Sequence, residues 1–149
     1  MMHDPDDQNG TPVTNAVDLE SVAEEVREVI ATYEAAIVAN DAEALIALFW
    51  NSSDAVRAAP NGFLVGAEEI ADFRRRRPAM DYRRDELRLK VTALSSDVVI
   101  AALEWQRSET IGYQTQTWLR TPDGWRVAMG HVSTPTGVHP SSHSRDGLK

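Results

Sequence analysis

The first half of the chain holds a phenol and a guanidinium that could act together on a small anion. Tyr33 lies on the apolar side of a predicted helix, where its hydroxyl would donate a hydrogen bond to a substrate or shuttle a proton. Arg57 lies in a short extended segment between Val56 and Ala58, and its planar guanidinium fits a carboxylate. Each residue also has an ordinary interpretation, as a core tyrosine or as a surface arginine.

Polar and aromatic side chains alternate along a predicted strand in the second half. Gln114, Gln116 and Trp118 share one face of this strand, because neighbouring side chains of a strand point to opposite sides. Two amides beside an indole suit an interior wall that holds a planar, hydrogen-bonding ligand. An exposed face of the sheet is the alternative interpretation.

Two more residues are candidates for a pocket. Arg74 begins a run of four arginines at a predicted helix end, where the helix dipole favours positive charge, and its neighbour Phe73 makes it the member expected to face a pocket. His131 lies on the last predicted strand, and a core histidine with satisfied hydrogen bonds is the alternative to a catalytic one. The residues expected on its face are Trp125, Val127, Met129 and Ser133.

The sequence lacks the residues that several classes of chemistry require. The chain has no cysteine, which excludes a thiolate nucleophile and a cysteine zinc site. No pair of histidines has metal-ligand spacing, and neither a Gly-rich phosphate loop nor a G-x-S-x-G elbow is present. The sequence therefore predicts no metal and no cofactor, and water is the expected nucleophile.

Length and charge narrow the class of protein. A chain of 149 residues is one domain with room for a sizeable core. Its net charge of −8 argues against a nucleic-acid partner. Its apolar stretches are short for a membrane span, and its N-terminus lacks the basic start and apolar run of a secretory signal. We therefore expect a cytoplasmic protein that does not bind membranes.

The chain divides into two tails around one domain. Residues 1–17 and 135–149 are polar and lack an apolar period, so we expect them to be disordered. Residues 18–134 form the expected domain, in which a helical period gives way to a strand period near residue 84.

The expected elements of this domain are helices followed by strands. Asp18 is the expected N-cap of the first helix, and Glu43 is the expected capping-box partner of Asn40 at the start of the second. Helices are expected at 19–37, from about Asn40, and between Gly66 and Pro78. Extended segments are expected at 55–58 and 63–65, and strands at 84–94, 97–108, 111–121 and 124–133. This order predicts an α+β domain, with about three helices on one face of a curved, mainly antiparallel sheet that encloses a conical pocket.

The element order resembles that of the NTF2-like superfamily, which includes the SnoaL-like and ketosteroid-isomerase-like proteins. Short motifs across residues 19–134 are more specific, and they resemble the AtzH-like family, which includes the HpxZ proteins of oxalurate catabolism. The motifs are Tyr33-Glu34-Ala35-Ala36, Leu48-Phe49-Trp50, Val56-Arg57, Phe73-Arg74, Arg77-Pro78, Glu104-Trp105-Gln106-Arg107, Gln114-Thr115-Gln116-Thr117-Trp118, Gly124-Trp125-Arg126-Val127 and His131-Val132-Ser133.

The resemblance implies a homodimeric cone fold. For the characterised member it implies a decarboxylating amidohydrolase that acts on 1,3-dicarboxyurea. The pocket tyrosine and arginine of the family fall on Tyr33 and Arg57, which are therefore the catalytic candidates. The candidates for substrate binding are Trp50, Arg74, Gln114, Gln116, Trp118 and His131.

Three hypotheses about function remain open. The first is hydrolysis of a small carboxylated urea or ureide, with Arg57 as a carboxylate clamp and Tyr33 as a hydrogen-bond donor or proton shuttle. The second is a protein without catalysis that binds a small carboxylate or assists an amidase. The third is an isomerase or dehydratase of the ketosteroid-isomerase type, which ranks last because His131 has no evident acidic partner.

Overall fold

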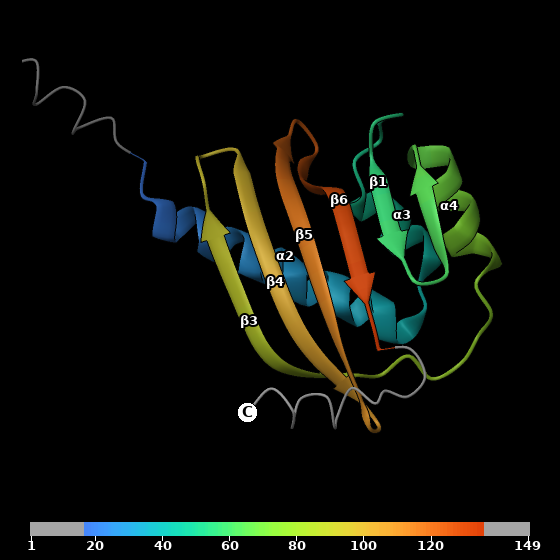
Figure 1. Cartoon of the computed structure of the whole chain (residues 1–149). Coiled ribbons are helices and arrows are strands. Elements are labelled where there is room, and N and C mark those ends of the chain that lie inside the picture. Colours follow the sequence, from blue (N-terminus) through green and yellow to red (C-terminus); the bar gives the residue numbers. More distant parts are fainter. Residues whose placement is uncertain (1–16, 136–149) are drawn as a thin grey trace, which may run out of the picture.

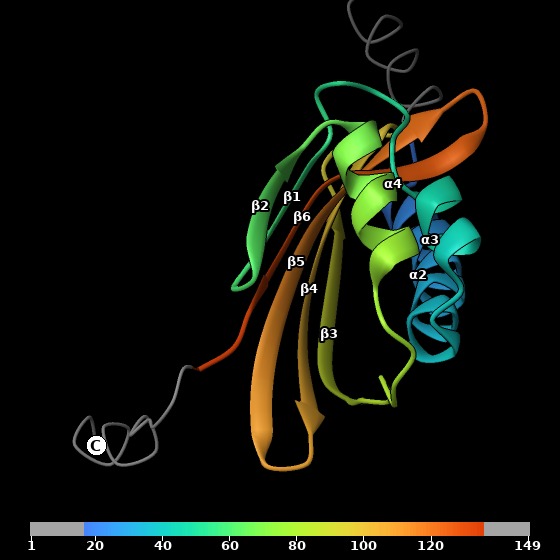
Figure 2. The same ribbon diagram turned by 90° about the vertical axis from the view of Figure 1, so that its right-hand side faces the viewer.

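Three helices pack on one face of a six-stranded sheet in the computed structural model, which describes residues 17–135 (Figures 1 and 2). The helices are α2 (Leu19–Ala39), α3 (Ala42–Leu48) and α4 (Ala67–Arg76). The strands are β1 (Val56–Ala59), β2 (Gly62–Val65), β3 (Asp85–Ala93), β4 (Val98–Arg107), β5 (Thr110–Thr121) and β6 (Gly124–Ser133). The expected α+β fold is confirmed, and the tails expected at 1–17 and 135–149 fall almost wholly outside the described residues.

The long helix α2 begins where the sequence predicts. Asp18 is its N-cap, and its carboxylate accepts hydrogen bonds from the backbone N–H groups of Glu20 and Ser21. One side of α2 is buried against the sheet, as its apolar period requires. In the part of the chain that the structure describes, no helix has the length and apolarity needed to cross a membrane.

The start of the second helix corrects the sequence prediction. Asn40 ends α2 in the left-handed region, with φ of 52°, and Asp41 is the N-cap of α3. Asparagine tolerates this conformation better than most residues, which is why a helix can end on it. Glu43 makes no capping box and instead pairs with Arg75 on α4.

The sheet is an antiparallel meander of β3 to β6 that is extended by a hairpin. Strands lie in the order β2-β1-β6-β5-β4-β3, and β1 pairs with β6 in parallel. This parallel pairing sets Arg57 beside Gly130 on β6. Ala55 and Arg57 are buried whereas Val56 and Ala58 are partly exposed, so the hairpin turns the Arg57 side chain toward the helices.

A β-bulge in β6 overturns one prediction about faces. Thr117 pairs with Met129, but the next residue of β5, Trp118, pairs with Val127, so Ala128 is an extra residue. The bulge reverses the alternation of β6 beyond this point. The face that was predicted to run from Trp125 to Ser133 is therefore split: Trp125 and Val127 are buried, and Met129, His131 and Ser133 are exposed.

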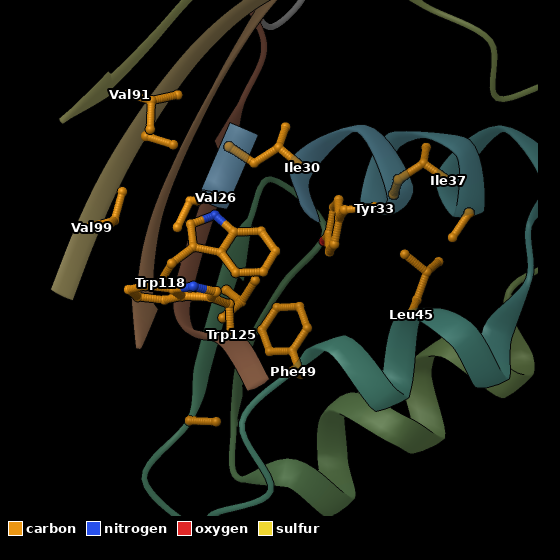
Figure 3. Packing of buried hydrophobic residues seen from close by; sticks show 14 of the residues in the cluster. Val26, Ile30, Tyr33, Ile37, Leu45, Phe49, Val91, Val99, Trp118 and Trp125 are labelled. Carbon is orange, nitrogen blue, oxygen red and sulfur yellow. The ribbon is translucent and has the colours of Figure 1, made fainter. Parts of the chain in front are cut away.

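The apolar core lies between α2, α3 and the inner face of the sheet (Figure 3). The Tyr33 ring is part of this core. It packs edge to face against the Trp118 ring, with ring centroids 6.0 Å apart, and the centroid of the Phe49 ring lies 6.5 Å from that of Tyr33. These contacts fix the ring of Tyr33 and leave its hydroxyl at the border of the core.

Candidate functional site

A cavity of about 210 Å³ opens where the C-terminal half of α2 meets the ends of α4, β4 and β6. The polar side chains that line it are those of Tyr33, Arg57, Asn61, Arg74, Arg77, Arg84, Trp105, Arg107, Gln114 and Thr134. Five of these are arginines and none is acidic. The cavity is therefore strongly positive although the whole chain is acidic.

Tyr33 and Arg74 are in direct contact at the inner end of this cavity. Nη2 of Arg74 donates a hydrogen bond to the Tyr33 hydroxyl over 3.1 Å, and both residues are buried. Because the hydroxyl oxygen accepts this bond, its own proton is free to be donated elsewhere. The sequence named Arg74 only as a pocket residue, and the structure makes it the partner of Tyr33.

Arg57 lies beside this pair, and no acidic side chain among the described residues compensates its charge. Its side chain is 7% exposed, and its guanidinium stacks on the Phe73 ring at 4.4 Å. Burial, together with the charge of Arg74, lowers the pKa of Arg57 to about 10. Among the described residues, Nη1 of Arg57 and Nε and Nη1 of Arg74 are buried without a hydrogen-bond partner. Two buried guanidiniums with unused N–H groups form a receptor for an anion.

The remaining arginines of the cavity have partners within the fold. Burial and the charge of Arg74 lower the pKa of Arg77, whose guanidinium stacks on Tyr82 at 4.1 Å. Arg107 donates to the backbone carbonyl oxygens of Arg83 and Tyr82. These two arginines add positive charge to the cavity while their positions are fixed by the protein.

Arg84 connects a carboxylate to the wall of the cavity. Two nitrogens of its guanidinium donate to the two oxygens of Glu34, at 3.0 and 2.7 Å. The same Nη2 also donates to Oε1 of Gln114 at 3.0 Å. Gln114 thus faces inward, as the first of the two interpretations of its strand predicted. Its amide is held by the Arg84–Glu34 ion pair, which the sequence analysis did not identify.

The other predicted substrate-binding residues lie away from this cavity. Gln116 is buried and accepts a hydrogen bond from the indole of Trp118, which is itself fully buried in the core. Trp50 lines a separate cavity of about 560 Å³ near the N-terminus of α4. His131 is exposed on the outer face of the sheet, where it lines a groove of about 290 Å³.

Four arginine and tryptophan residues of the cavity were not among the predicted site residues: Arg77, Arg84, Trp105 and Arg107. Trp105 and Arg107 belong to a row of alternate residues on β4 that starts at buried Val99, so the period of two could have placed them inside. Arg84 precedes β3, and no local pattern reports its contact with Glu34, which lies fifty residues earlier in the chain.

The chemistry of the cavity is that of a hydrogen-bond donor and cation site. No group of three or more His, Asp or Glu side chains suited to a metal occurs in residues 17–135. The cavity also contains no histidine–carboxylate pair among its described lining residues, which an isomerase or dehydratase of the third hypothesis would use. Anion binding and proton transfer through Tyr33 are the steps that its side chains can perform.

Known proteins share both the sequence pattern and the architecture. The AtzH-like family model matches residues 15–136. A DUF3225-family protein of unknown function from Pectobacterium atrosepticum has a TM-score of 0.75 and 35% identity over 78% of this chain and 92% of that chain. A cystatin-like fold protein from Burkholderia xenovorans has a TM-score of 0.72 and 33% identity over 76% and 92% of the two chains. No curated protein matches the chain.

The wider fold is also that of an NTF2-like superfamily protein from Salmonella enterica, with a TM-score of 0.62 and 24% identity over 82% of this chain and 96% of that chain. The family match and the arginine-lined cavity together describe a small-molecule-binding protein with this fold. The fold is thus the NTF2-like one, and because the family model covers nearly the whole domain, the chain belongs to the AtzH-like family.

Proposed function

We propose that this protein hydrolyses a C–N bond of a small carboxylated urea or ureide, of which 1,3-dicarboxyurea is the leading candidate. The observation that carries the proposal is the buried pair Arg57 and Arg74, which has three nitrogens without a partner among the described residues and whose Arg74 donates to the Tyr33 hydroxyl. The activity that the AtzH-like resemblance implies supports the same choice of substrate.

Binding of the substrate carboxylate is the role of the two arginines. Two adjacent guanidiniums repel each other, and the pKa of Arg57 is lowered by its burial and then by this repulsion from Arg74. A carboxylate between them neutralises the repulsion and accepts charge-assisted hydrogen bonds, each worth about 1.5–3 kcal/mol. Its fixed position then orients the scissile bond against Tyr33.

Proton transfer is the role of Tyr33. When water attacks the carbon of the C–N bond, the bonding electron pair leaves with nitrogen, which must gain a proton. The phenol gives its proton to that nitrogen and takes one from the attacking water, so the tyrosine ends each cycle unchanged. The hydrogen bond from Arg74 stabilises negative charge on the phenol oxygen while the proton is in transit.

Product release from defined substrates tests this proposal. Ammonia and carbon dioxide would be measured with freshly generated 1,3-dicarboxyurea and with oxalurate. We expect Arg57→Ala and Tyr33→Phe each to lower kcat/KM by about a hundredfold or more. Arg75→Ala is the matched control, because Arg75 follows Arg74 on α4 but lies exposed in a surface pair with Glu43. Unchanged release in both cavity variants would refute the mechanism.

A second candidate is a carboxylate-binding protein without catalysis, either alone or as the partner of an amidase. It is favoured by one observation: no acidic or histidine side chain that could act as a general base is among the described residues lining the cavity. Tight binding of unaltered substrate over hours, with no product, would establish this alternative. Recovery of an amidase in a pull-down would then support the accessory role.

A further inference from the structure

The ring of Phe73 on α4 lies among three guanidiniums. The Cζ atom of Arg57 is 4.4 Å from the ring centroid, that of Arg74 is 5.6 Å and that of Arg77 is 5.7 Å from it. All three distances fall within the range of about 6 Å in which the face of an aromatic ring attracts a cation. Arg57 reaches the ring from β1, whereas Arg74 and Arg77 belong to the end of α4. One phenyl ring thus connects three arginines of the cavity.

Packing of the core does not account for the position of this ring. Phe73 is partly exposed. In residues 17–135 it belongs neither to the apolar core nor to the partly buried apolar residues packed against that core. It is also absent from the described residues that line the arginine cavity, so it acts on the cavity through its neighbours. The cations around it are what distinguishes its position.

The charge of Arg57 requires a source of stabilisation that is not a carboxylate. The guanidinium is buried, and the described lining of the cavity contains no acidic side chain. Burial first, and then the charge of Arg74, lower the pKa of Arg57 to about 10, and Tyr33 and Arg77 are the other groups whose charge affects it. The face of the Phe73 ring opposes this effect, because its negative potential favours the charged form.

A ring and a carboxylate stabilise a guanidinium from different directions. A carboxylate accepts hydrogen bonds from the N–H groups, which point outward in the plane of the guanidinium, whereas an aromatic ring packs on the face of that plane. Phe73 therefore stabilises the charge of Arg57 without engaging its donors, and Nη1 of Arg57 has no hydrogen-bond partner in the part of the chain that is described. An acidic residue in its place would occupy the donors that an anionic ligand requires.

We infer that Phe73 is a positioning residue of the anion site, whose ring holds the guanidinium of Arg57, favours its charged form and leaves its N–H groups free for a carboxylate. The inference rests on the anion-binding role that the proposed function gives to Arg57. It adds to that function a residue that acts on the ligand only through the arginine.

Calorimetric titration with glutarate tests the effect on binding. Glutarate is a stable carboxylate without a C–N bond, and its chain has the same length as that of 1,3-dicarboxyurea. We expect Phe73→Leu to weaken glutarate binding at pH 7.5 by about threefold or more, because an apolar side chain without a ring no longer holds the guanidinium. Phe73→Tyr keeps a ring and should bind within about twofold of the wild-type protein. Phe63→Leu is the matched control, since Phe63 is an exposed phenylalanine on β2 outside this group of cations.

The same titration at pH 9.5 separates positioning from a structural role. The carboxylates of glutarate are ionised at both pH values, so a change with pH reports on the protein. Since loss of the ring disfavours the charged form of Arg57, the deficit of Phe73→Leu relative to the wild-type protein should grow by about another threefold at pH 9.5. A deficit of equal size at both pH values, or Phe73→Tyr binding as weakly as Phe73→Leu, would overturn the inference.

Heteronuclear NMR of the guanidinium groups tests the same inference without a ligand. The signal of Arg57 is assigned by its loss in Arg57→Lys, and we expect its titration midpoint in Phe73→Leu to lie about one pH unit below that of the wild-type protein. An unchanged midpoint would overturn the role of Phe73 even in a protein that releases product from 1,3-dicarboxyurea. A lowered midpoint in a protein that binds glutarate and releases no product retains the role of Phe73 and loses the hydrolase assignment.

Discussion

At the scale of single residues, the buried charges of the cavity lower the stability of the free protein and favour the binding of an anion. Arg57 and Arg74 are buried next to each other, and three of their nitrogens lack partners among the described residues. Such an arrangement is unfavourable in the free protein, because neither charge is paired. It becomes favourable once an anion is present, which is the expected signature of a binding site rather than of a core.

Replacing Arg74 by methionine should therefore have opposite effects on folding and on binding. We expect Arg74→Met to leave the free energy of unfolding unchanged or raised by about 1 kcal/mol, because an uncompensated charge is removed from the interior. Carboxylate affinity should fall at least about tenfold. Urea unfolding and calorimetry measure the two quantities, with Arg75→Met as the surface control. A large loss of stability in Arg74→Met would show that the arginine supports the fold.

Carboxylate binding should also depend on pH through Arg57. Burial and the charge of Arg74 lower the pKa of Arg57 to about 10, so its charge is complete at neutral pH and is lost as the pH rises through that value. Affinity should therefore be constant up to about pH 9 and weaken above about pH 10, because the deprotonated guanidine no longer attracts the anion.

Calorimetry across this range, repeated in a Tyr33→Phe background, checks that prediction. The second protein removes the phenol that lines the same cavity as Arg57. If the weakening above pH 10 disappears in this background, the assignment to Arg57 is wrong.

At the scale of elements, the packing of neighbouring strands determines where the cavity side chains lie. Gly112 on β5 leaves room for the indole of Trp105 on β4, and the short hairpin of β1 and β2 turns Arg57 inward. The helix α2 contributes Tyr33 and Glu34 from neighbouring positions, one in the core and one toward Arg84. Substitutions at such points should act on the cavity through the backbone.

Gly112→Ala provides a test of this dependence. The added methyl group overlaps the Trp105 ring, so the ring or the strand must move, and we expect a loss of about 1–3 kcal/mol in the free energy of unfolding. Gly62→Ala on β2 is the control, because a Cβ atom there meets nothing within 4 Å. Thermal or urea unfolding of the two variants makes the comparison. Equal stabilities would contradict the close approach of Gly112 to Trp105.

The helices and strands could be predicted from the sequence where the residue pattern that defines them lies within neighbouring residues. The meander was predicted to within about two residues at each strand end, because its turns and its period of two are written in neighbouring residues. The same alternation placed Gln114, Gln116 and Trp118 on one face but left open whether that face is inward or exposed. The outward position of His131 did not follow from it, since the bulge at Ala128 breaks the alternation without a glycine or proline to mark it. The contact of Arg84 with Glu34 joins distant segments, and no local pattern encodes it.

At the scale of the whole molecule, the sheet has one face covered by helices and one that the described residues leave open (Figure 2). Ile100, Tyr113 and Met129 are large apolar side chains on β4, β5 and β6 that are more than 40% exposed. Their positions outside the alternating buried rows put them on the open face. An apolar patch of this kind is typical of an interface, and we propose that two copies of the chain associate through it.

The mass of the protein in solution tests this proposal. We expect a dimer by light scattering at micromolar concentration, and a monomer for Met129→Lys, because a charge in the patch opposes burial. Leu94→Lys is the control, since Leu94 is also exposed but lies after the end of β3. Carboxylate binding should survive in the Met129→Lys monomer. A wild-type monomer would disprove the proposed dimer.

The bulge in β6 has a consequence for how such a pocket can change. Beyond Ala128, Val132 lines the cavity while His131 and Met129 belong to the opposite surface. Because strand side chains alternate, deletion of Gly130, just after the bulge, would turn His131 to the cavity face and Val132 to the opposite surface in a single event. An imidazole would then enter a cavity of arginines, and an apolar residue would join the outer patch. Insertions and deletions, rather than point substitutions alone, are thus a short evolutionary route between pockets of different chemistry on this sheet.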